Sequence, residues 1–176
     1  MAEGSKFELR TYLKYFLTLK GIFRAIDFCY FGFYFVIASI LSGALSPYGA
    51  STSLHQSSLG FSAFVAFWVA VGEVVMSLVD ILNLSFLQPY AFIILLSETI
   101  GHGVAGILLF TTLIATIAYA ATTGSCGTAA CQAVIGINGA GAFFGFIGVI
   151  LLGVTVGVYI YLLISGRGTK KSADPV

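Results

Sequence analysis

The sequence predicts an all-α membrane protein in which four transmembrane helices form one bundle with both termini on the cytoplasmic side. Three observations lead to this fold class: an apolar composition, four long apolar stretches, and basic residues confined to the two ends of the chain. Of the 176 residues, 59% are hydrophobic and 9% are charged, whereas about a quarter of the residues in soluble domains are charged. Because a bilayer core of about 30 Å needs about 20 apolar residues per helix, this chain holds about four spans and no additional soluble domain.

The four expected spans occupy residues 22–44, 59–82, 89–121 and 133–164. The third and fourth are longer than a straight crossing requires, so they either tilt or extend beyond the lipid surface. The domain organisation is then a cytoplasmic basic amphipathic segment (1–21), a four-helix transmembrane domain (22–164) and a cytoplasmic tail (165–176). The charged stretch before the first span and the lack of an A-x-A-like exit argue against a cleaved signal peptide, so the first span is expected to direct its own insertion.

The positions of the basic residues predict the topology. All eight lie near the ends of the chain: Lys6, Arg10, Lys14, Lys20, Arg24, Arg167, Lys170 and Lys171. Because cytoplasmic flanks are rich in Lys and Arg, both termini are expected in the cytoplasm, which agrees with an even number of spans. The uncharged loops "SPYGASTSLHQSS" and "TTGSCGTAAC" then face the lumen or the exterior. The turn "NLSFLQP" is cytoplasmic, so the glycosylation sequon at Asn83 is expected to stay unmodified.

The N-terminal segment allows two interpretations. Its cations Lys6, Arg10 and Lys14 recur every four residues, with aromatic residues between them. This pattern suits a helix that lies in the lipid headgroup layer, and it equally suits a basic flank that only sets orientation. The formal net charge of +1 predicts no binding to nucleic acid.

Four acidic residues and one histidine lie inside the expected spans: Asp27, Glu73, Asp80, Glu98 and His102. No lysine or arginine lies deeper than Arg24. Glu98 and His102 are four residues apart and therefore share a helix face, as do Glu73 and Asp80, seven apart. At about 1.5 Å per residue from the cytoplasmic turn, Glu73 and Glu98 reach a similar depth, with His102 about one turn further. The hairpin of the second and third spans is thus expected to contain a cluster of ionisable groups.

Several roles are open to this cluster. An unpaired charge in mid-membrane costs at least about 2.5 kcal/mol, so the groups are expected to face the bundle interior. They could form a proton relay, a cation site or a zinc site; zinc is disfavoured because only one intramembrane histidine is present. The favoured interpretation is structural, with protonated carboxyls and His102 bonding across helices at about 1 kcal/mol per contact. Two of the acids lie near an interface, and no span is broken by an internal proline as transporter sites often are.

Small residues predict close helix packing. The stretch "GHGVAG" matches G-x-G-x-x-G, but it lies within a long apolar helix, where packing and not dinucleotide binding is expected. In the fourth span, Gly141 with Gly145 and Gly153 with Gly157 form two G-x-x-x-G pairs. Such pairs bring helices together either within one bundle or between copies of a protein.

The remaining motifs predict a disulfide and no catalysis. Cys126 and Cys131 flank "GTAA" in the last outer loop, where an oxidising compartment would permit a disulfide. Cys29 lies in the first span and is expected to pack there. The sequence contains no Ser-His-Asp set, no H-E-x-x-H, no C-x-x-C and no phosphate loop, so neither an enzyme nor a bound cofactor or metal is expected.

Three stretches carry a resemblance to a known family: "LTLKGIFRAIDF", "CYFGFYFVIASIL" and "GAGAFFGFIGVILLGVTVGVYIY". With four spans and a cysteine-containing outer loop, the chain resembles the MARVEL-domain tetraspans, which include MAL, plasmolipin, the physins, the gyrins and occludin. The resemblance implies a non-enzymatic role in membrane apposition, vesicle trafficking or lateral organisation, in vesicles or the plasma membrane. It also implies self-association, contact with cholesterol-containing lipid, and outer-loop cysteines at Cys126 and Cys131. The number of intramembrane acids departs from the family pattern.

Three functions follow as hypotheses. The first is a non-enzymatic tetraspan that organises membrane through helix packing and lipid contact. The second is a proton or cation pathway that uses Glu73, Glu98 and His102. The third is an accessory subunit of a larger membrane complex, with the glycine-rich fourth span as its docking face.

Overall fold

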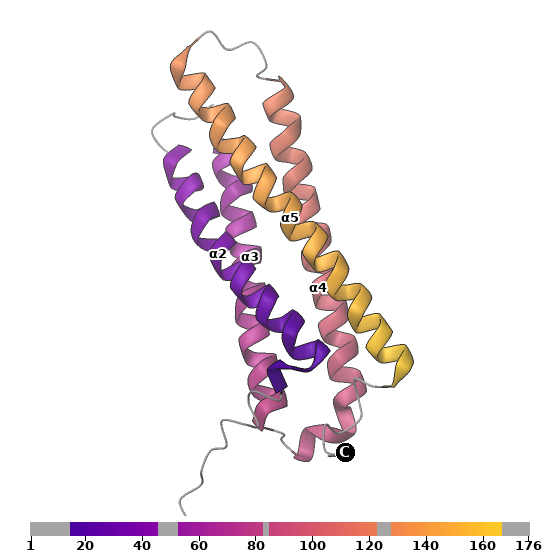
Figure 1. Ribbon diagram of the computed structural model, residues 1–176. Helices are drawn as coiled ribbons and strands as arrows, with labels where there is room; N and C mark the ends of the chain where they lie inside the picture. The colour runs from indigo at the N-terminus through magenta and orange to yellow at the C-terminus, as the bar shows by residue number, and fades with distance from the viewer. Residues whose placement is uncertain (1–14, 46–52, 83–84, 123–127, 167–176) are drawn as a thin grey trace, which may run out of the picture.

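The computed structural model is all-helical and describes residues 15–45, 53–82, 85–122 and 128–166. Its long helices are α2 (Leu19–Leu45), α3 (Ser53–Leu82), α4 (Ala91–Thr122) and α5 (Ala129–Ser165), and the short 3-10 helix η3 (Ser85–Tyr90) joins α3 to α4 (Figure 1). All four long helices are long and apolar enough to cross a membrane. The prediction of an all-α protein with four apolar helices is thereby confirmed for the described residues.

The helix bounds follow the predicted spans with small differences. The predicted third span began at Pro89, whereas Pro89 lies in η3 and α4 begins at Ala91. The fourth predicted span, 133–164, lies inside a helix of 37 residues. At 1.5 Å per residue such a helix is about 55 Å long, which exceeds a bilayer core of about 30 Å.

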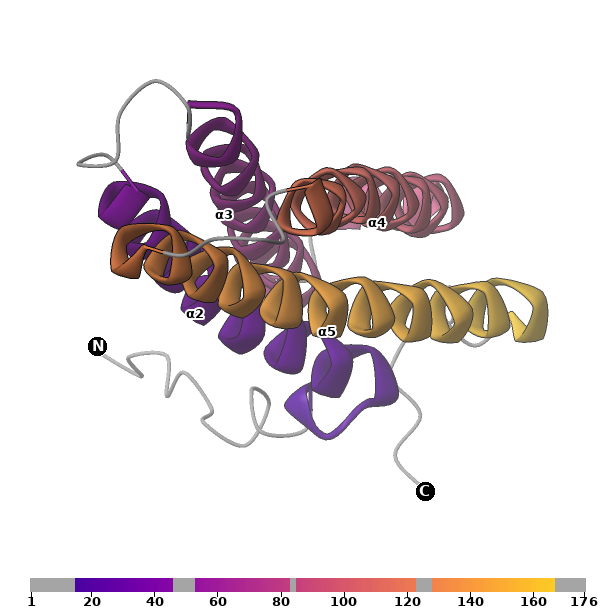
Figure 2. The same ribbon diagram turned by 90° about the horizontal axis from the view of Figure 1, so that it is seen from above.

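The helices form an up-and-down bundle. Helix α2 packs along α3, and α4 packs along α5, while α3 and α5 touch only slightly. From above, α3 and α4 lie on one side of α5, and the first turns of α2 lie on the other (Figure 2). Helix α2 begins and α5 ends at the same end of the bundle, which we call the Lys20 end (Figure 1).

A tight turn precedes α2 and brings Tyr15 back against this helix. The Thr18 hydroxyl accepts a hydrogen bond from the Gly21 amide at 3.1 Å, which caps the first turn of α2. A Cβ atom at Gly21 would collide with the Tyr15 carbonyl, so this position requires glycine. The turn thereby holds Tyr15 close to the inner face of α2.

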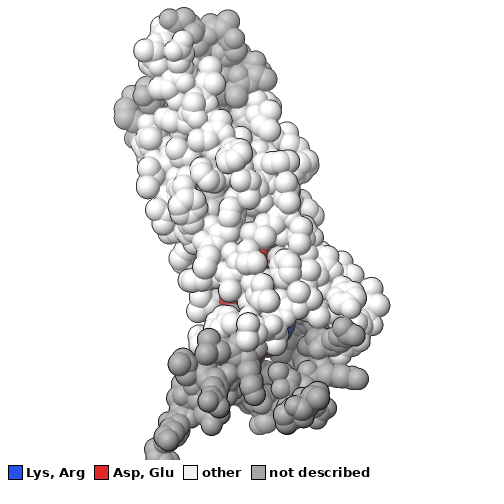
Figure 3. All heavy atoms as spheres, in the orientation of Figure 1, with Lys and Arg blue, Asp and Glu red and all other residues white. Residues whose placement is uncertain are grey.

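The interior at the middle of the bundle is apolar. Buried residues from all four helices form its core: Phe31, Tyr34, Ala38, Ala63, Val65, Ala66, Ala70, Ala105, Leu109 and Leu152. The outer surface is apolar as well, and charged atoms are scarce over the described part of the face in Figure 3. Large apolar side chains such as Phe33, Trp68 and Ile107 are more than half exposed. A surface of this kind suits lipid.

The two glycine pairs of α5 lie on different faces. Gly141 and Gly145 are buried; a Cβ at Gly141 would collide with Leu59, and one at Gly145 would lie 3.2 Å from the Tyr34 hydroxyl. Gly153 and Gly157 are exposed, and an added Cβ meets nothing within 4 Å. The same open space surrounds Gly101 and Gly103 in α4, which therefore mediate no close approach among the described residues.

Candidate functional site

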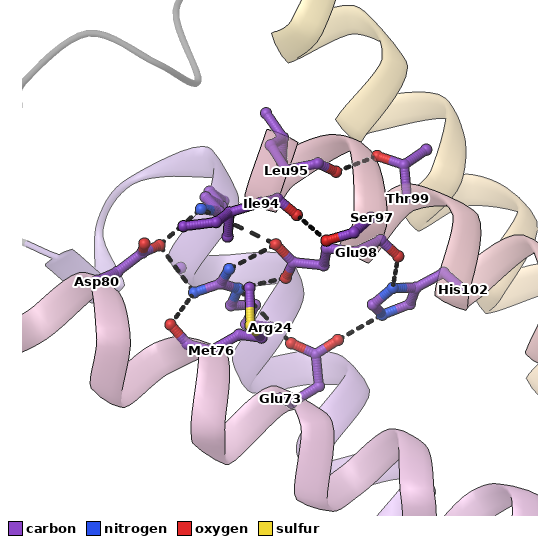
Figure 4. A network of polar contacts seen from close by, with 12 residues as sticks. Arg24, Glu73, Met76, Asp80, Ile94, Leu95, Ser97, Glu98, Thr99 and His102 are labelled. Atoms are coloured by element: carbon purple, nitrogen blue, oxygen red, sulfur yellow. Dashed lines mark hydrogen bonds and ion pairs between the residues drawn. The ribbon is translucent and has the colours of Figure 1, made fainter. Parts of the chain in front are cut away.

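The five ionisable residues predicted inside the spans lie together in the half of the bundle nearer the Lys20 end. Asp27 comes from α2. Glu73 and Asp80 come from α3, and Glu98 and His102 from α4 (Figure 4). All except Asp80 are buried. Two basic residues of α2, Lys20 and Arg24, join them, and we call these seven residues the charged cluster.

Arg24 is the centre of the charged cluster. Its side chain is 0% exposed. Nε and Nη2 donate to the two carboxylate oxygens of Glu98 at 2.8 and 2.7 Å, a paired geometry that is among the strongest hydrogen-bonding arrangements in proteins. Nη1 reaches Asp80 Oδ2 at 2.8 Å, the Met76 carbonyl at 2.7 Å and the Tyr15 hydroxyl at 2.7 Å. One guanidinium therefore ties α2 to both α3 and α4.

The rim of the charged cluster lies toward the Lys20 end. Lys20 Nζ lies 2.7 Å from Asp80 Oδ2, and both side chains are partly exposed. Tyr15 lies beside them on the turn before α2, and burial raises the pKa of its phenol above the ordinary value. These residues lie between the buried Arg24–Glu98 pair and the Lys20 end of the bundle.

His102 occupies the inner part of the charged cluster. Its Nδ1 lies 2.8 Å from the Glu98 carbonyl oxygen, and since a carbonyl only accepts, Nδ1 carries a hydrogen. Nε2 therefore faces Glu73 Oε1 at 2.5 Å and Asp27 Oδ2 at 3.8 Å. A contact as short as that with Glu73 requires one proton between the two atoms. On the other side, the Thr155 hydroxyl of α5 donates to Asp27 Oδ2 at 2.8 Å.

Three buried polar atoms of this inner part have no hydrogen-bond partner among the described residues. They are Asp27 Oδ1, Glu73 Oε2 and the Tyr159 hydroxyl. The Tyr159 ring packs edge-on against the His102 ring, with 5.4 Å between centroids. Buried polar atoms are nearly always satisfied in proteins, so these three mark a place where the bonding is incomplete.

The charged cluster carries a net negative charge. Four carboxylates contribute four negative charges, while Lys20, Arg24 and the proton shared by His102 and Glu73 contribute three positive charges. One negative charge is left over in the ionised state. Because a bare buried charge is costly, the charged cluster needs one more proton or cation to be neutral.

A groove reaches the charged cluster sideways, between α3 and α4. Its volume is about 380 Å³, and Phe64, Trp68, Val104 and Leu108 are among the apolar residues that line it. Glu98 and His102 also border the groove. The groove is therefore an apolar indentation of the outer surface that ends near the buried polar residues.

Toward the other end of the bundle, polar contacts among the described residues join hydroxyl groups, and the Tyr30 hydroxyl donates to the Phe144 carbonyl. Ser62 Oγ lies 2.9 Å from Thr112 Oγ1, and Ser58 Oγ lies 3.3 Å from Thr116 Oγ1. The apolar core that includes Phe31, Ala66 and Leu109 fills the interior between these hydroxyl pairs and the charged cluster. Among the described residues, no hydrogen bond connects these hydroxyl pairs to the charged cluster.

Sequence reasoning placed the acids and His102 together but missed the role of Arg24. Arg24 was assigned to the cytoplasmic flank because it is the innermost basic residue of the N-terminal group. A signal was nevertheless present, since positions 24, 27, 31, 34 and 38 recur at helical spacing, and the structure buries all five. A basic residue on the buried face of a helix is expected to pair with an acid.

The prediction that Cys29 packs within the first span is wrong, because its thiol is free and exposed. Cys131 lies in the first turn of α5, where its amide donates to the capping Thr128 hydroxyl at 3.4 Å. Cys126 lies outside the described residues, so the disulfide between Cys126 and Cys131 stays a prediction. The sequon at Asn83 and most of the N-terminal segment, residues 1–14, also lie outside them.

Comparisons with known proteins identify no relative. No family model, no curated protein and no solved structure matches the chain.

Proposed function

We propose that this protein is a non-enzymatic tetraspan that organises the membrane around it through helix packing and lipid contact. The observation that carries this proposal is the closure of the charged cluster: Arg24, Glu98 and Asp80 bind one another across three helices. An apolar core then fills the interior beyond them. Such an interior stabilises a bundle, and the function is left to the outer surface.

The outer surface supports contact with lipid. It is apolar on all four helices, and the groove between α3 and α4 offers about 380 Å³ for an acyl chain. The proposal includes membership of the MARVEL-domain tetraspans, a place in vesicle or plasma membranes, and cytoplasmic termini. These rest on the sequence resemblance and the charge distribution.

A proton or cation pathway through Glu73, Glu98 and His102 is the competing function. The three residues do lie close together, but no hydrogen bond among the described residues connects them to the hydroxyl pairs beyond the core of buried residues such as Ala66 and Leu109. The structure therefore favours a static role for Glu98, which is held by Arg24.

Reconstitution separates the two functions. The protein is placed in liposomes that contain a pH-sensitive dye, and proton uptake is driven by a potassium diffusion potential. We expect the same uptake for the protein, for the Glu98→Gln variant and for empty liposomes. Uptake that requires the protein and is abolished by Glu98→Gln would replace the proposed function with a proton pathway.

Lipid contact is tested with Trp68, the single tryptophan of the chain, which is 56% exposed on α3 beside the groove. Lipids brominated on their acyl chains are expected to quench its fluorescence, whereas acrylamide added to the water is not. Strong quenching by acrylamide alone would contradict a lipid-facing α3. A single homogeneous species on a native gel in mild detergent would count against an obligatory partner.

A further inference from the structure

The inner part of the charged cluster brings three metal-binding side chains together from three helices. Asp27, Glu73 and His102 are all buried, and one ligand atom from each lies within 4.8 Å of the other two. We propose that these residues bind one divalent transition-metal ion, with Zn²⁺ as the best fit. The proposal is independent of the function argued above.

The distances suit a small tetrahedral ion. Zinc binds nitrogen and carboxylate oxygen at about 2.0–2.2 Å, which places neighbouring ligand atoms about 3.3–3.5 Å apart. His102 Nε2 lies 2.5 Å from Glu73 Oε1 and 3.8 Å from Asp27 Oδ2, so the two distances bracket this spacing. Rotations of the side chains that move atoms by less than about 1 Å would complete the geometry.

Hydrogen bonds already orient two of the three ligands. His102 donates from Nδ1 to the Glu98 carbonyl at 2.8 Å, which leaves the lone pair of a neutral Nε2 directed at the carboxylates. The Thr155 hydroxyl holds Asp27 Oδ2 at 2.8 Å. In metal sites, a histidine almost always donates its other ring hydrogen to a carbonyl or carboxylate, and ligating carboxylates are likewise held by hydrogen bonds.

Buried atoms that make no hydrogen bond provide a separate reason to place an ion here. Asp27 Oδ1 and Glu73 Oε2 are buried and accept no hydrogen bond from the described residues, although Arg24 Nε lies 3.7 Å from Glu73 Oε2. The Tyr159 hydroxyl, whose ring packs against His102, likewise makes no hydrogen bond with them. A cation would draw both carboxylates toward one point. With three protein ligands, the fourth position is left for a water molecule, and the Tyr159 hydroxyl is a suitable partner for that water.

Charge balance favours a divalent ion. The ionised charged cluster carries one excess negative charge when a proton lies between His102 and Glu73. Replacing this proton with an ion of charge +2 makes the whole charged cluster neutral. A second proton on Asp27 would also achieve neutrality, and this is the alternative that the experiment must separate. Imidazole together with carboxylates is a donor set that selects zinc over calcium or magnesium.

The test uses the full chain, purified in detergent and stripped with a chelator. Cys29→Ser is introduced throughout, because Cys29 is an exposed free thiol that would bind zinc by itself. Zinc binding is measured by metal analysis after gel filtration and by competition with a chromophoric chelator. Cobalt absorption then reports the coordination geometry. The variants are Asp27→Asn, which keeps the shape of the side chain and its bond to Thr155, His102→Asn, and the control His55→Asn.

We expect one zinc ion per chain and a tetrahedral cobalt spectrum. Affinity should fall at least about 10-fold in Asp27→Asn and in His102→Asn, and should be unchanged in His55→Asn. Helical content and elution volume verify folding; if His102→Asn does not fold, Asp27→Asn decides. Absence of zinc from the parent chain would overturn the proposal and leave a second proton as the neutralising group. Equal affinity in the parent and Asp27→Asn would also overturn it.

Discussion

At the scale of single residues, Arg24 explains how Glu73, Asp80 and Glu98 are kept inside an apolar bundle. A buried ion pair stabilises little by itself, because taking the charges out of water offsets most of their attraction. Removing one partner is different, since it leaves the other charges buried and unpaired. Arg24 has partners on both α3 and α4, so its loss would leave the buried Glu98 without its paired hydrogen bonds, while Asp80 would keep only Lys20.

Replacement of Arg24 by Met is therefore expected to lower the free energy of unfolding by about 3–5 kcal/mol. Lys20→Met is the matched control, because Lys20 also pairs with Asp80 but at a partly exposed position; its loss should cost less than about 1 kcal/mol. The measurement is reversible unfolding in mixed micelles, followed by circular dichroism. Equal losses of unfolding free energy in the two variants would show that Arg24 stabilises the bundle no more than the partly exposed Lys20 does.

The conservative variant Arg24→Lys separates charge from geometry. It keeps the positive charge but cannot bind both oxygens of Glu98 at once, as Nε and Nη2 of Arg24 do. We expect an intermediate loss of stability in the same unfolding assay. Stability equal to that of the parent protein would mean that only the charge at position 24 matters.

The meeting of Glu73, Glu98 and His102 could be predicted from their depth alone, because the hairpin fixes how far each residue lies from the turn. The hydrogen-bond partners could not be predicted in this way. The rotation of α2 about its own axis decides whether Asp27 faces His102 or Thr155. In the structure Asp27 contacts both. Arg24 was missed because basic residues near a span end are equally common as topology signals.

At the scale of the elements, the two faces of α5 differ in how closely another helix approaches them. The face with Gly141 and Gly145 allows close approach of α2 and α3, through Tyr34 and Leu59. The face with Gly153 and Gly157 is open. The spacing of the glycines in the sequence identifies both pairs, but it does not show which side of α5 each pair faces. The direction depends on which residues of α5 are buried, such as Asn138 and Thr155, and a helix apolar on nearly all sides hides this from the sequence.

Leucine substitutions distinguish the two faces of α5. Gly141→Leu is expected to destabilise the bundle by about 1–3 kcal/mol, because the added side chain overlaps Leu59 in a filled interior. Gly153→Leu meets open space and should leave the unfolding midpoint nearly unchanged. Thermal unfolding in detergent provides the comparison. A larger loss in Gly153→Leu than in Gly141→Leu would contradict the orientation of α5.

Gly153 also bears on self-association, which the family resemblance implies. If copies meet through the open face of α5, Gly153→Leu will lower energy transfer between donor- and acceptor-labelled copies in vesicles by blocking close approach. Gly43→Leu is the control, because Gly43 is likewise exposed with nothing within 4 Å but lies on α2. Transfer that is unchanged in Gly153→Leu would move the contact to another face.

At the scale of the whole molecule, the polar residues of the interior are distributed unevenly along the axis of the bundle. The charged cluster lies toward the Lys20 end, and the interior beyond it is apolar with scattered hydroxyl groups. The four-helix fold followed from composition and length, since so apolar a chain has few other solutions in lipid. The angle at which α5 crosses α2 did not follow, because side-chain packing sets it.

The predicted disulfide between Cys126 and Cys131 tests which end of the bundle faces an oxidising compartment. If the end opposite the Lys20 end faces an oxidising compartment, Cys126 and Cys131 will resist alkylation until a reductant is added, as mass spectrometry of the labelled chain would show. Cys29 serves as an internal control, because it is a free thiol. Labelling of Cys126 and Cys131 without reductant would place them in a reducing compartment or leave them unpaired.

Protease protection tests the predicted orientation of the whole chain. Short epitope tags are placed at the N-terminus, at the C-terminus, or after residue 124 in the loop between α4 and α5, and the proteins are expressed in sealed microsomes. Because α2 begins and α5 ends at the Lys20 end, and basic residues mark the cytoplasmic side, both terminal tags should be digested. The tag after residue 124 should survive until detergent is added. Survival of one terminal tag would require an odd number of spans, and survival of both would invert the bundle and place the charged cluster on the lumenal side.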